Sequence, residues 1–473
     1  MSKTYDFLVI GGGSAGYAAA RTAHEFGLKT AVVDGAPELG GLCILRGCMP
    51  SKTLIESSNR FRAMRRASEF GLSAENLSVS TEKIIARKRV LIDDFASYRQ
   101  QQLQDERFDL IRGHASFSSP HSVTVRPLGG GDPFEVEFKT SLISAGSKIS
   151  RIHIDGLEET GYWTSNDVLD AETVPPSFIV LGGGAIALEM ACYLEGIGRN
   201  VTVIQRSDQV LSGSDRDVAD AVKDAINERE NINIITGTSL KRVTLDPESG
   251  KKVVIFEKDG KEQQVEANEI LQALGRSPHS DGLQTSEANV AVDHKGRVEC
   301  GPDQRTSTEH IFAAGDICGP HEIVHIAIEQ GEIAANNAAI HLGKNARPIR
   351  KMDYRLVLLG IFTDPEVATV GLTEEEAKKK GLSLASATYP FDDHGKSMVK
   401  GETHGFVKMI ANTETGEIVG AAVVGPEATE LIHEITVAMH FHCTTEEFLK
   451  IPHYHPTLSE IWTYPAEDLL FSD

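Results

Sequence analysis

Cys43 and Cys48 are the residues whose type and spacing point most directly to chemistry, because two thiols so close in a chain can be oxidised to a disulfide. They lie in the segment GGLCILRGCMPSK, which runs from Gly40 to Lys52. In an unbroken helix, residues five apart are separated by about 7.5 Å along the axis. The Cα atoms of a disulfide lie closer together, at about 4.4–6.8 Å. A redox pair here therefore requires a bend in the chain, which Gly47 permits.

A helix is expected to begin near Cys48, because Pro50 suits the first turn of a helix and the segment continues through Lys52. The positive end of that helix would stabilise a thiolate, so we expect the more stable thiolate at Cys48. A chance approach of two thiols and a metal site are the alternatives that this segment leaves open. The spacing is not CxxC, and no second cluster of Cys and His follows at zinc-finger spacing, which argues against a metal.

A histidine and a carboxylate five residues apart, His455 and Glu460, form a second candidate for chemistry in the segment HYHPTLSE. A carboxylate that holds one ring nitrogen of an imidazole fixes its tautomer and raises its basicity, as a proton-transferring base requires. The chain contains 17 histidines, so a surface or core role for His455 is the alternative.

The elements that could position these groups begin with a dinucleotide-binding pattern near the N-terminus. An apolar strand over Tyr5–Ile10 runs into Gly11-Gly12-Gly13-Ser14-Ala15-Gly16, and an Ala-rich helix follows to Phe26. This is GxGxxG in its proper context, where glycines allow a pyrophosphate to approach the helix N-terminus. A second strand ends in Asp34, whose carboxylate could hold a ribose diol.

A second pattern of the same kind begins with the strand Phe178–Leu181 and continues as Gly182-Gly183-Gly184-Ala185-Ile186-Ala187. Alanine at the third glycine position is tolerated. The next strand ends in Gln205-Arg206, where an NAD-binding unit usually carries an acid. The missing acid and the added arginine favour a 2′-phosphate, so NADPH is favoured over NADH. Two patterns in one chain predict two dinucleotides.

Several later segments predict how these units are completed. Leu142–Gly146 is expected to be a strand that ends in small residues, and 273–278 (ALGRSP) to be the closing strand of the second unit. Ile311–Asp316 is expected to return to the first sheet, with Asp316 at the ligand-binding edge. From residue 351 onward we predict antiparallel strands at 365–372, 406–410 and 418–424, followed by helices from Glu427.

Length and composition place limits on the function. A chain of 473 residues predicts about three domains. The net charge of −21 argues against nucleic acid and anionic membranes as partners. There is no apolar run near the length of about 18 residues that a membrane span needs, and no secretory signal, so we predict a cytoplasmic protein. Six cysteines are too few for a disulfide scaffold.

Together these motifs resemble the FAD-dependent pyridine nucleotide–disulfide oxidoreductases, the family of dihydrolipoyl dehydrogenase, glutathione reductase and mercuric reductase. The first fingerprint, CxxxxC, the second fingerprint, GRSP, AAGD and HPTLSE occur in the family's order over essentially the whole chain. The resemblance implies an α/β fold with two Rossmann-like domains, for FAD and NAD(P), and a C-terminal α+β dimerisation domain. The implied boundaries are 1–148 for the FAD domain, completed by 278–350, then 149–277 for the NAD(P) domain and 351–473 for the interface domain.

The resemblance also assigns roles to matching positions. Cys48 would be the thiolate that faces the flavin, and Cys43 the thiol that exchanges with substrate. His455, oriented by Glu460, would shuttle the proton and reach the cysteines from the other subunit of a homodimer. Lys52 would lie beside flavin N5 with Glu189 as its ion-pair partner. The positions implied to bind FAD are Gly11, Gly13, Ser14, Ala15, Gly16, Asp34, Gly41, Lys52, His114, Ala115, Ala145, Gly146, Asp316 and Val324, and those implied to bind NAD(P) are Gly182, Gly184, Ala187, Gln205, Arg206 and Gly275; no metal is expected.

Within the family, the HxHPTLSE form and the small Ala185 are similar to dihydrolipoyl dehydrogenase, which implies a dihydrolipoyl substrate, free or on a separate carrier protein. Gln205-Arg206 departs from that enzyme's NAD-selecting glutamate. The C-terminus LLFSD lacks the cysteine pair of mercuric reductase. Two alternatives stay open: an NADPH-dependent reductase of a low-molecular-weight disulfide, and a flavin electron-transfer component that turns over no disulfide.

Overall fold

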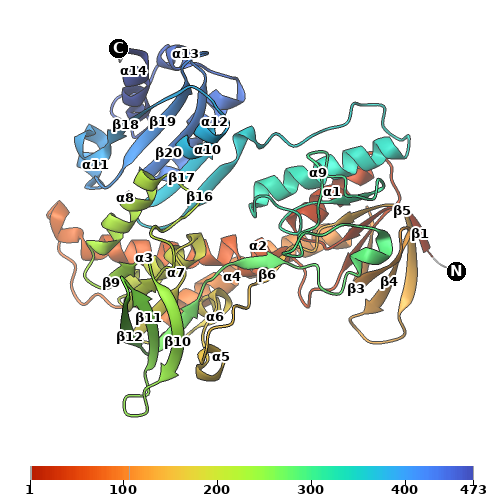
Figure 1. Ribbon diagram of the computed structural model, residues 1–473, viewed down its shortest axis with the longest axis horizontal. Coiled ribbons are helices and arrows are strands. Elements are labelled where there is room, and N and C mark those ends of the chain that lie inside the picture. Colours follow the sequence, from red (N-terminus) through yellow and green to blue (C-terminus); the bar gives the residue numbers. More distant parts are fainter. Residues whose placement is uncertain (1–2, 106, 472–473) are drawn as a thin grey trace. The chain divides into compact units, whose positions relative to one another are not determined.

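The computed structural model describes residues 3–105 and 107–471, and the chain divides into two compact units (Figure 1). The first unit comprises Met1–Ser51, Ala86–Arg151 and Gly275–Asp353. The second comprises Lys52–Ile85, Ile152–Leu274 and Tyr354–Asp473. The helices α3 (Cys48–Arg65) and α4 (Thr81–Gln104) each contribute residues to both units.

The first unit is built on a six-stranded sheet whose core is parallel. The strands are β1 (Lys3–Ile10), β2 (Thr30–Asp34), β3 (Asp109–Ser119), β4 (Ser122–Pro127), β5 (Phe134–Ile143) and β15 (Ile311–Ala313). Strand β1 pairs in parallel with both β2 and β5, while β15 pairs with β5 and β3 with β2. The one antiparallel strand, β4, joins β3 to the first residues of β5. Buried Phe, Val and Leu side chains along β1 fit such a doubly covered sheet.

Two helices of this unit pack together, α1 (Ser14–Glu25) and α9 (Val324–His341) (Figure 1). Gly331 of α9 faces the backbone of Ala15, because a Cβ atom at Gly331 would overlap the Ala15 carbonyl oxygen. The other elements are α2 (Gly41–Arg46), the 3-10 turn Thr285–Ala288 and a ribbon of β6 (Ser147–Ile149) with β14 (Arg276–Pro278).

The second unit contains a parallel four-stranded sheet in the order β13-β7-β8-β9, with bounds Glu269–Gln272, Ser177–Leu181, Asn200–Ile204 and Ile232–Ile235. Helices α7 (Ala185–Gly196) and α8 (Arg216–Asn227) follow β7 and β8. A three-stranded antiparallel sheet of β10 (Ser239–Leu245), β11 (Lys252–Lys258) and β12 (Lys261–Ala267) connects β9 to β13. Two short helices, α5 (Leu157–Thr160) and α6 (Ser165–Asp170), precede β7.

The C-terminal part of the second unit is an antiparallel sheet in the order β16-β17-β20-β19-β18. Its strands span Leu358–Ile361, Glu366–Gly371, Ile418–Gly425, Phe406–Asn412 and Leu384–Pro390. The helices of this part are α10 (Glu374–Lys379), α11 (Gly395–Lys400), α12 (Ala428–His440), α13 (Thr445–Leu449) and α14 (Thr463–Phe471). The strands predicted at 365–372, 406–410 and 418–424 are therefore confirmed, and β16 and β18 are added to them.

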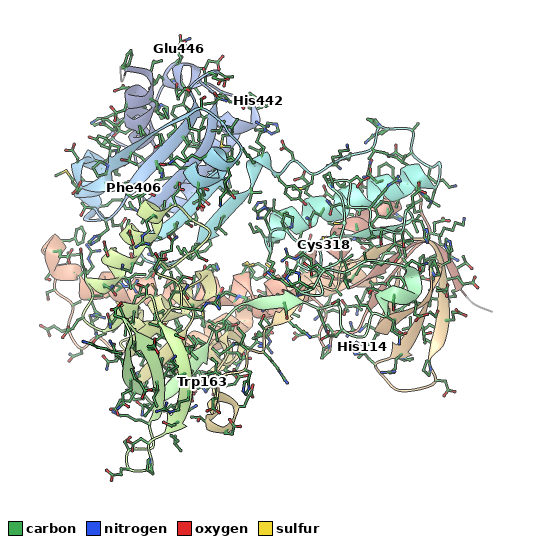
Figure 2. The ribbon with its side chains drawn as sticks, in the orientation of Figure 1. His114, Trp163, Cys318, Phe406, His442 and Glu446 are labelled. Atoms are coloured by element: carbon green, nitrogen blue, oxygen red, sulfur yellow. The ribbon has the colours of Figure 1, made fainter. Side chains whose placement is uncertain are left out.

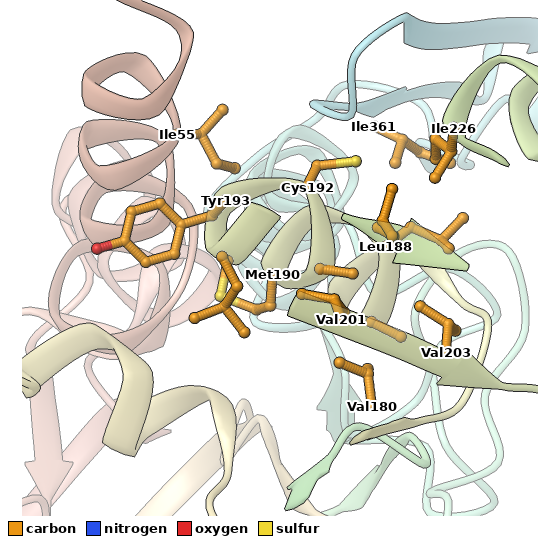
Figure 3. Close-up of a cluster of buried hydrophobic side chains, with 14 of the residues drawn as sticks. Ile55, Val180, Leu188, Met190, Cys192, Tyr193, Val201, Val203, Ile226 and Ile361 are labelled. Atoms are coloured by element: carbon orange, nitrogen blue, oxygen red, sulfur yellow. The ribbon is translucent and has the colours of Figure 1, made fainter. Parts of the chain in front are cut away.

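The largest hydrophobic cluster of the second unit surrounds α7, whose side chains are buried on nearly every face. Figure 3 shows Leu188, Met190, Cys192 and Tyr193 of this helix together with Val180, Val201 and Val203 of the adjoining strands. The helix that follows the second glycine pattern is thus fixed by packing on its own sheet and on Ile55 of α3. Such packing holds the glycine turn before it in place.

Two details differ from the sequence prediction. The closing strand of the second parallel sheet is β13, and the predicted segment 273–278 lies after it. Its last three residues form β14 and pair with β6 in the first unit, because Gly275, with φ +109°, redirects the chain. The alternating apolar residues around Val123 and Val136 predict a small separate sheet from the sequence, but in the structure they extend the main sheet through β4.

The mixed α/β fold with a separate C-terminal antiparallel sheet confirms the predicted fold class. The three domain boundaries stay a prediction. No helix within the described ranges combines the length and the apolar character that crossing a membrane requires.

Candidate functional site

The carboxyl edge of the first sheet gathers four predicted segments. Register aligns Ile10 with both Val33 and Ile143, and Ala313 with Ile143. Gly11, Ser144 and Ala314 follow these strand ends and Asp34 is the last residue of β2, so the four residues meet at one edge. Backbone hydrogen bonds continue the ladder there, since Gly11 N donates to Val33 O at 2.8 Å and Ser144 N donates to Ile10 O at 2.9 Å. Ligands of open parallel sheets bind at this edge.

The first glycine pattern has the geometry of a phosphate cradle. Gly11 has φ +103°, and a Cβ atom at Gly16 would overlap the Gly11 carbonyl oxygen. Gly41 lies against the same turn, because a Cβ atom there would be 2.8 Å from the Cα atom of Gly13. Gly13 caps α1, and no side chain among the described residues caps that end. The uncapped first-turn amides of Ser14 and Ala15 can thus donate hydrogen bonds to an anion.

Asp34 supports this turn as well as facing the edge. Its carboxylate accepts hydrogen bonds from Gly12 N and Ala36 N, both at 2.8 Å, and Arg112 lies 3.3 Å away. Each carboxylate oxygen has two lone pairs, so capacity for a ribose hydroxyl is left. His114, labelled in Figure 2, lies over Gly35, where a Cβ atom would overlap its ring. The structure thus brings His114, with Ala115 beside it on β3, to the end of β2.

Asp316 is held at the same edge by a short chain of hydrogen bonds. Ser147 donates from Oγ to Asp316 at 2.5 Å, and Arg276 donates from Nε to Ser147 at 2.8 Å. The loop that bears Asp316 is fixed by Gln330, which accepts from Gly315 N at 2.7 Å and donates to Gly319 O at 2.8 Å. The remaining predicted positions lie nearby in sequence order: Ala145 and Gly146 after β5, and Val324 at the first position of α9.

The cysteine segment bends as predicted. Cys43 lies in α2 and Cys48 is the first residue of α3, with Gly47 between the two helices at φ −127° and ψ −114°. Gly47 approaches Cys43 closely, because a Cβ atom at Gly47 would lie 3.2 Å from the Cys43 Cα atom. Both cysteines are half-buried. The N-terminal position of Cys48 on an 18-residue helix favours its thiolate.

Lys52 forms the predicted ion pair with Glu189. Its Nζ atom lies 2.8 Å from one carboxylate oxygen of Glu189 and 3.0 Å from the other. Glu189 is buried on α7 and also accepts from Phe362 N at 3.0 Å, and the lysine nitrogen lies 4.6 Å from the centre of the Phe362 ring. The pair is thus anchored at both ends and holds the lysine in one orientation.

The carboxyl edge of the second parallel sheet brings together the second glycine pattern and Gln205. Gly182 N donates to Ile204 O at 2.9 Å, and a Cβ atom at Gly182, which has φ +115°, would overlap the Ala273 carbonyl oxygen. The stem of Gln205 covers Gly183. Arg206 follows it with an exposed side chain, and none of the described residues forms an ion pair with it. Gly184 caps α7, and Ala187 is buried in its first turn.

His455 and Glu460 are joined as predicted, with Nδ1 of His455 2.9 Å from a Glu460 oxygen. A second histidine lies on the other side of this carboxylate: Nε2 of His394 is 3.6 Å from Glu460. His394 is buried, and its Nδ1 contacts the hydroxyl of Ser397 at 2.9 Å. Burial lowers the pKa of His394, and it is opposed by the Glu460 charge, which acts to raise it. Glu460 is therefore held between one exposed and one buried imidazole.

Sequence reasoning missed three contributors to these sites: His394 behind Glu460, Arg112 beside Asp34, and the Arg276–Ser147 pair beside Asp316. His394 precedes Glu460 by more than sixty residues, so no local spacing connects them. Arg276 lies in the GRSP motif, which offered a signal for its importance. No signal in the sequence pointed to Arg112. Among residues 3–105 and 107–471, no three His, Cys, Asp or Glu side chains gather as a metal site.

These residues fit an FAD in the first unit. The glycine cradle and the uncapped α1 suit a pyrophosphate, while Asp34 and Asp316 lie at the two flanks of one sheet edge. The second edge has the same kind of glycine turn and an α7 N-terminus that no described side chain caps, which also suit a pyrophosphate. The chemistry that these groups could support is electron transfer between a dinucleotide and the cysteine pair.

Comparisons with known proteins agree with this geometry. The family model described as pyridine nucleotide-disulphide oxidoreductase matches residues 5–331, and the dimerisation domain of that family matches residues 358–466. The chain is 33% identical to a dihydrolipoyl dehydrogenase of Bacillus subtilis over 97% of each chain. It is also 33% identical to a mercuric reductase of Staphylococcus aureus, over 94% of this chain and 78% of that one.

Among solved structures, the chain is similar to the Cu(II) complex of RclA, an HOCl-induced flavoprotein disulfide reductase from Escherichia coli. The TM-score is 0.84 and the identity 25%, with 99% of both chains covered. The C-terminal match supports a homodimer. The protein is thus an oxidoreductase that belongs to the pyridine nucleotide-disulphide oxidoreductase family, whose members use FAD and NAD(P).

Proposed function

We propose that the protein catalyses electron transfer between NAD(P)(H) and a dihydrolipoyl or lipoyl group through FAD and a Cys43–Cys48 disulfide. The observation that carries the proposal is the His455–Glu460 pair. The imidazole is 80% exposed while its Nδ1 is held by Glu460 at 2.9 Å. Its Nε2 is therefore available to a thiol that arrives from outside, as a dithiol on a flexible arm would. The full-length relatives named dihydrolipoyl dehydrogenase support this substrate class.

Each group has a proposed role in this reaction. In the oxidising direction, His455 takes a proton from one substrate thiol, and the resulting thiolate attacks the sulfur of Cys43. The Cys43–Cys48 bond breaks, and its electron pair stays on Cys48, where the N-terminus of α3 stabilises the thiolate. The second substrate thiol then loses its proton to solvent as its sulfur attacks the mixed disulfide, and Cys43 leaves and takes up the proton held by His455. This gives a substrate disulfide, with Cys43 as a thiol and Cys48 as a thiolate. Bound FAD and NAD(P) would accept the two electrons from this reduced cysteine pair.

The remaining roles are those of orientation. Glu460 fixes the tautomer of His455, and the Lys52–Glu189 pair would provide a fixed positive charge at the flavin. In a homodimer, the C-terminal sheet and helices of one subunit would present His455 to the cysteines of the other. The exposed side chain of His455 is consistent with a partner group that lies outside its own subunit.

For the pyridine nucleotide we propose NADPH in preference to NADH. Arg206 follows the end of β8, and its side chain is exposed and forms no ion pair with any described residue, so it can bind a 2′-phosphate. An acid at this position would repel that phosphate. Gln205 lies against Gly183 and carries no charge that would select an unphosphorylated ribose.

The test is anaerobic titration of the purified flavoprotein with NADH and, separately, with NADPH. A long-wavelength charge-transfer band between a thiolate and the flavin is expected at two electrons per flavin, and the nucleotide that produces it at the lower concentration identifies the preferred cofactor. Direct bleaching of the flavin without this band would overturn the role of Cys43 and Cys48 and favour the electron-transfer alternative.

The Cys48→Ser variant gives the matched control. It should lose turnover of dihydrolipoamide and of small disulfides, whereas reduction of artificial acceptors by NAD(P)H should persist. Wild-type assays with dihydrolipoamide and with glutathione disulfide then separate the proposed substrate from the low-molecular-weight disulfide alternative. Faster turnover of glutathione disulfide than of lipoamide would replace the proposed substrate.

A further inference from the structure

A second pair of cysteines, Cys300 and Cys318, lies in the first unit, on segments separate from Cys43 and Cys48. Cys318, labelled in Figure 2, follows β15 on the loop that begins at Gly315. The Cys318 thiol donates to the carbonyl oxygen of Gly315 at 3.3 Å, the Cys300 thiol faces Oε1 of Gln304 at 3.9 Å, and the two thiols lie close enough for each to shift the pKa of the other. Both side chains pack on the hydrophobic cluster on one face of the main sheet.

The backbone holds these two segments against each other near the cysteines. Val298 N donates to the carbonyl oxygen of Ile317 at 2.9 Å. The guanidinium of Arg297 covers Gly319, where a Cβ atom would lie 2.7 Å from Arg297 Nη1. One residue on either side of Cys318 is thus tied to the segment that leads to Cys300. The fold therefore holds the two cysteine-bearing segments side by side.

The two thiols differ in reactivity and access. The neighbouring Cys318 thiol lowers the pKa of Cys300, whereas the Cys300 sulfur and burial raise the pKa of Cys318. Cys300 is partly exposed, and Cys318 is only 7% exposed. The accessible sulfur is thus the one that ionises more readily, and the protonated sulfur lies behind it. Oxidant-sensitive cysteines share this arrangement of a reachable thiolate beside a second thiol.

We propose that Cys300 and Cys318 are a second oxidisable pair, which a peroxide converts to a disulfide. The Cys300 thiolate attacks one peroxide oxygen, so that an S–O bond forms, the O–O bond breaks and water leaves after protonation. The Cys318 sulfur then attacks the sulfur of Cys300, which forms the S–S bond and releases a second water with the Cys318 proton. Two thiols are oxidised and one hydrogen peroxide is reduced to two waters.

The disulfide would restrain the loop that bears Asp316. Asp316 lies two residues before Cys318, and Gln330 holds the same loop through Gly315 N and Gly319 O. Oxidation adds a covalent tie between this loop and the segment at Cys300. The inference rests on the thiol pair itself and does not depend on the proposed substrate of Cys43 and Cys48.

The experiment treats the full-length holoenzyme with hydrogen peroxide, blocks remaining thiols by alkylation and maps tryptic peptides without reduction. Trypsin separates the two cysteines, because Cys300 lies in the peptide 298–305 and Cys318 in the peptide 306–344. A linked pair of these peptides is expected, and dithiothreitol should remove it. If Cys43–Cys48 is oxidised while Cys300 and Cys318 are both fully alkylated, the proposal is overturned.

Variants sharpen the result. In Cys318→Ser the Cys300 sulfur has no resolving thiol, so it should appear as sulfinic acid after excess peroxide. The matched control is Cys443→Ser, because Cys443 is also half-buried but burial raises its pKa; this variant should keep the linked peptides. Conversion of Cys300 to sulfinic acid in the wild type, without any linked peptide, would also overturn the proposal. The wild-type measurement stands even where a variant fails to fold.

Discussion

Nδ1 of His455 lies 2.9 Å from a carboxylate oxygen of Glu460, although the imidazole side chain is 80% exposed and the carboxylate only 12%. The buried partner is therefore the fixed one, and it orients an otherwise mobile ring. An imidazole held at one nitrogen in this way presents the other nitrogen in a defined tautomer.

Replacing His455 by alanine should lower kcat for dithiol or disulfide turnover by about 10²–10⁴-fold, because the proton acceptor is lost. Flavin binding and reduction of artificial acceptors should be unchanged. The matched control is His442→Ala, which removes another exposed imidazole, 2.7 Å from Glu417. Near-normal disulfide turnover in His455→Ala would show that this imidazole transfers no proton.

His394 should make the stability of the protein depend on pH. Burial lowers its pKa in the folded state, whereas an unfolded histidine titrates near pH 6.5. As the pH falls through about 6.5, the unfolded chain therefore binds more protons at this histidine than the folded chain does. The free energy of unfolding should decrease as the pH is lowered in this range, by at most about 1.4 kcal/mol per pH unit for this group. Denaturant unfolding of wild type and His394→Asn between pH 7.5 and 5.5 measures the effect. Equal slopes in the two proteins would contradict it.

The ion pair between the half-buried Lys52 and the buried Glu189 predicts non-additive effects on stability. Lys52→Met leaves a buried carboxylate without its cation, which should cost about 3–5 kcal/mol of unfolding free energy. The double variant Lys52→Met/Glu189→Gln should recover part of this loss. Lys241→Met is the control, because it removes one partner of an exposed pair at 3.0 Å and should cost no more than about 1 kcal/mol. Additive losses in a double-mutant cycle would argue against a coupled pair.

Lys408 holds three carboxylates together inside the second unit. Its Nζ lies 2.9 Å from Asp217, 3.1 Å from Asp215 and 2.6 Å from Glu374, and the side chain is 2% exposed. Lys408→Met should therefore destabilise the protein by about 3–5 kcal/mol. Lys379→Met, at an exposed pair with Glu375, should have no measurable effect.

The same contact sets the acid sensitivity of this cluster. The hydrogen bond from Lys408 lowers the pKa of Glu374 below 4.5. The contribution of the ionised Glu374 to the free energy of unfolding is therefore complete above pH 4.5 and is lost as the pH falls through the pKa of the folded state. Acid unfolding of Lys408→Met should accordingly show a smaller loss of stability below pH 4.5 than the wild type shows. A loss as steep as that of the wild type would contradict this assignment.

Arg206→Ala should lower kcat/KM for NADPH by about 10-fold or more, because a charged hydrogen bond to phosphate is lost, and should leave NADH almost unchanged. Arg216→Ala is the control, because Arg216 is another exposed arginine that follows β8 in the chain but already pairs with Asp208 and Asp220. Steady-state kinetics with both nucleotides provides the measurement. An equal effect on NADH and NADPH would remove the basis for the proposed preference.

The glycine patterns, the strands that precede them and the C-terminal antiparallel strands could be predicted because each rests on local periodicity and turn chemistry. The pairs Lys52–Glu189 and His455–Glu460 were accessible through motifs whose spacing or family match links the two partners. His394 and Arg112 were not, since each meets its carboxylate through tertiary packing of segments distant in the chain. Residues 273–278 were misassigned because an apolar strand pattern does not show which sheet it joins, and Gly275 turned the chain away.

The ribbon of β6 and β14 joins the point where the chain leaves the first unit to the point where it returns. Ser150 N donates to Gly275 O at 3.1 Å, so residues 152–274 begin and end side by side. Because the entropy cost of closing a loop grows only with the logarithm of its length, a change in the length of this excursion alters the cost of joining its ends very little. The ribbon is in effect a permissive insertion point, at which a segment with its own four-stranded parallel sheet is carried within the chain.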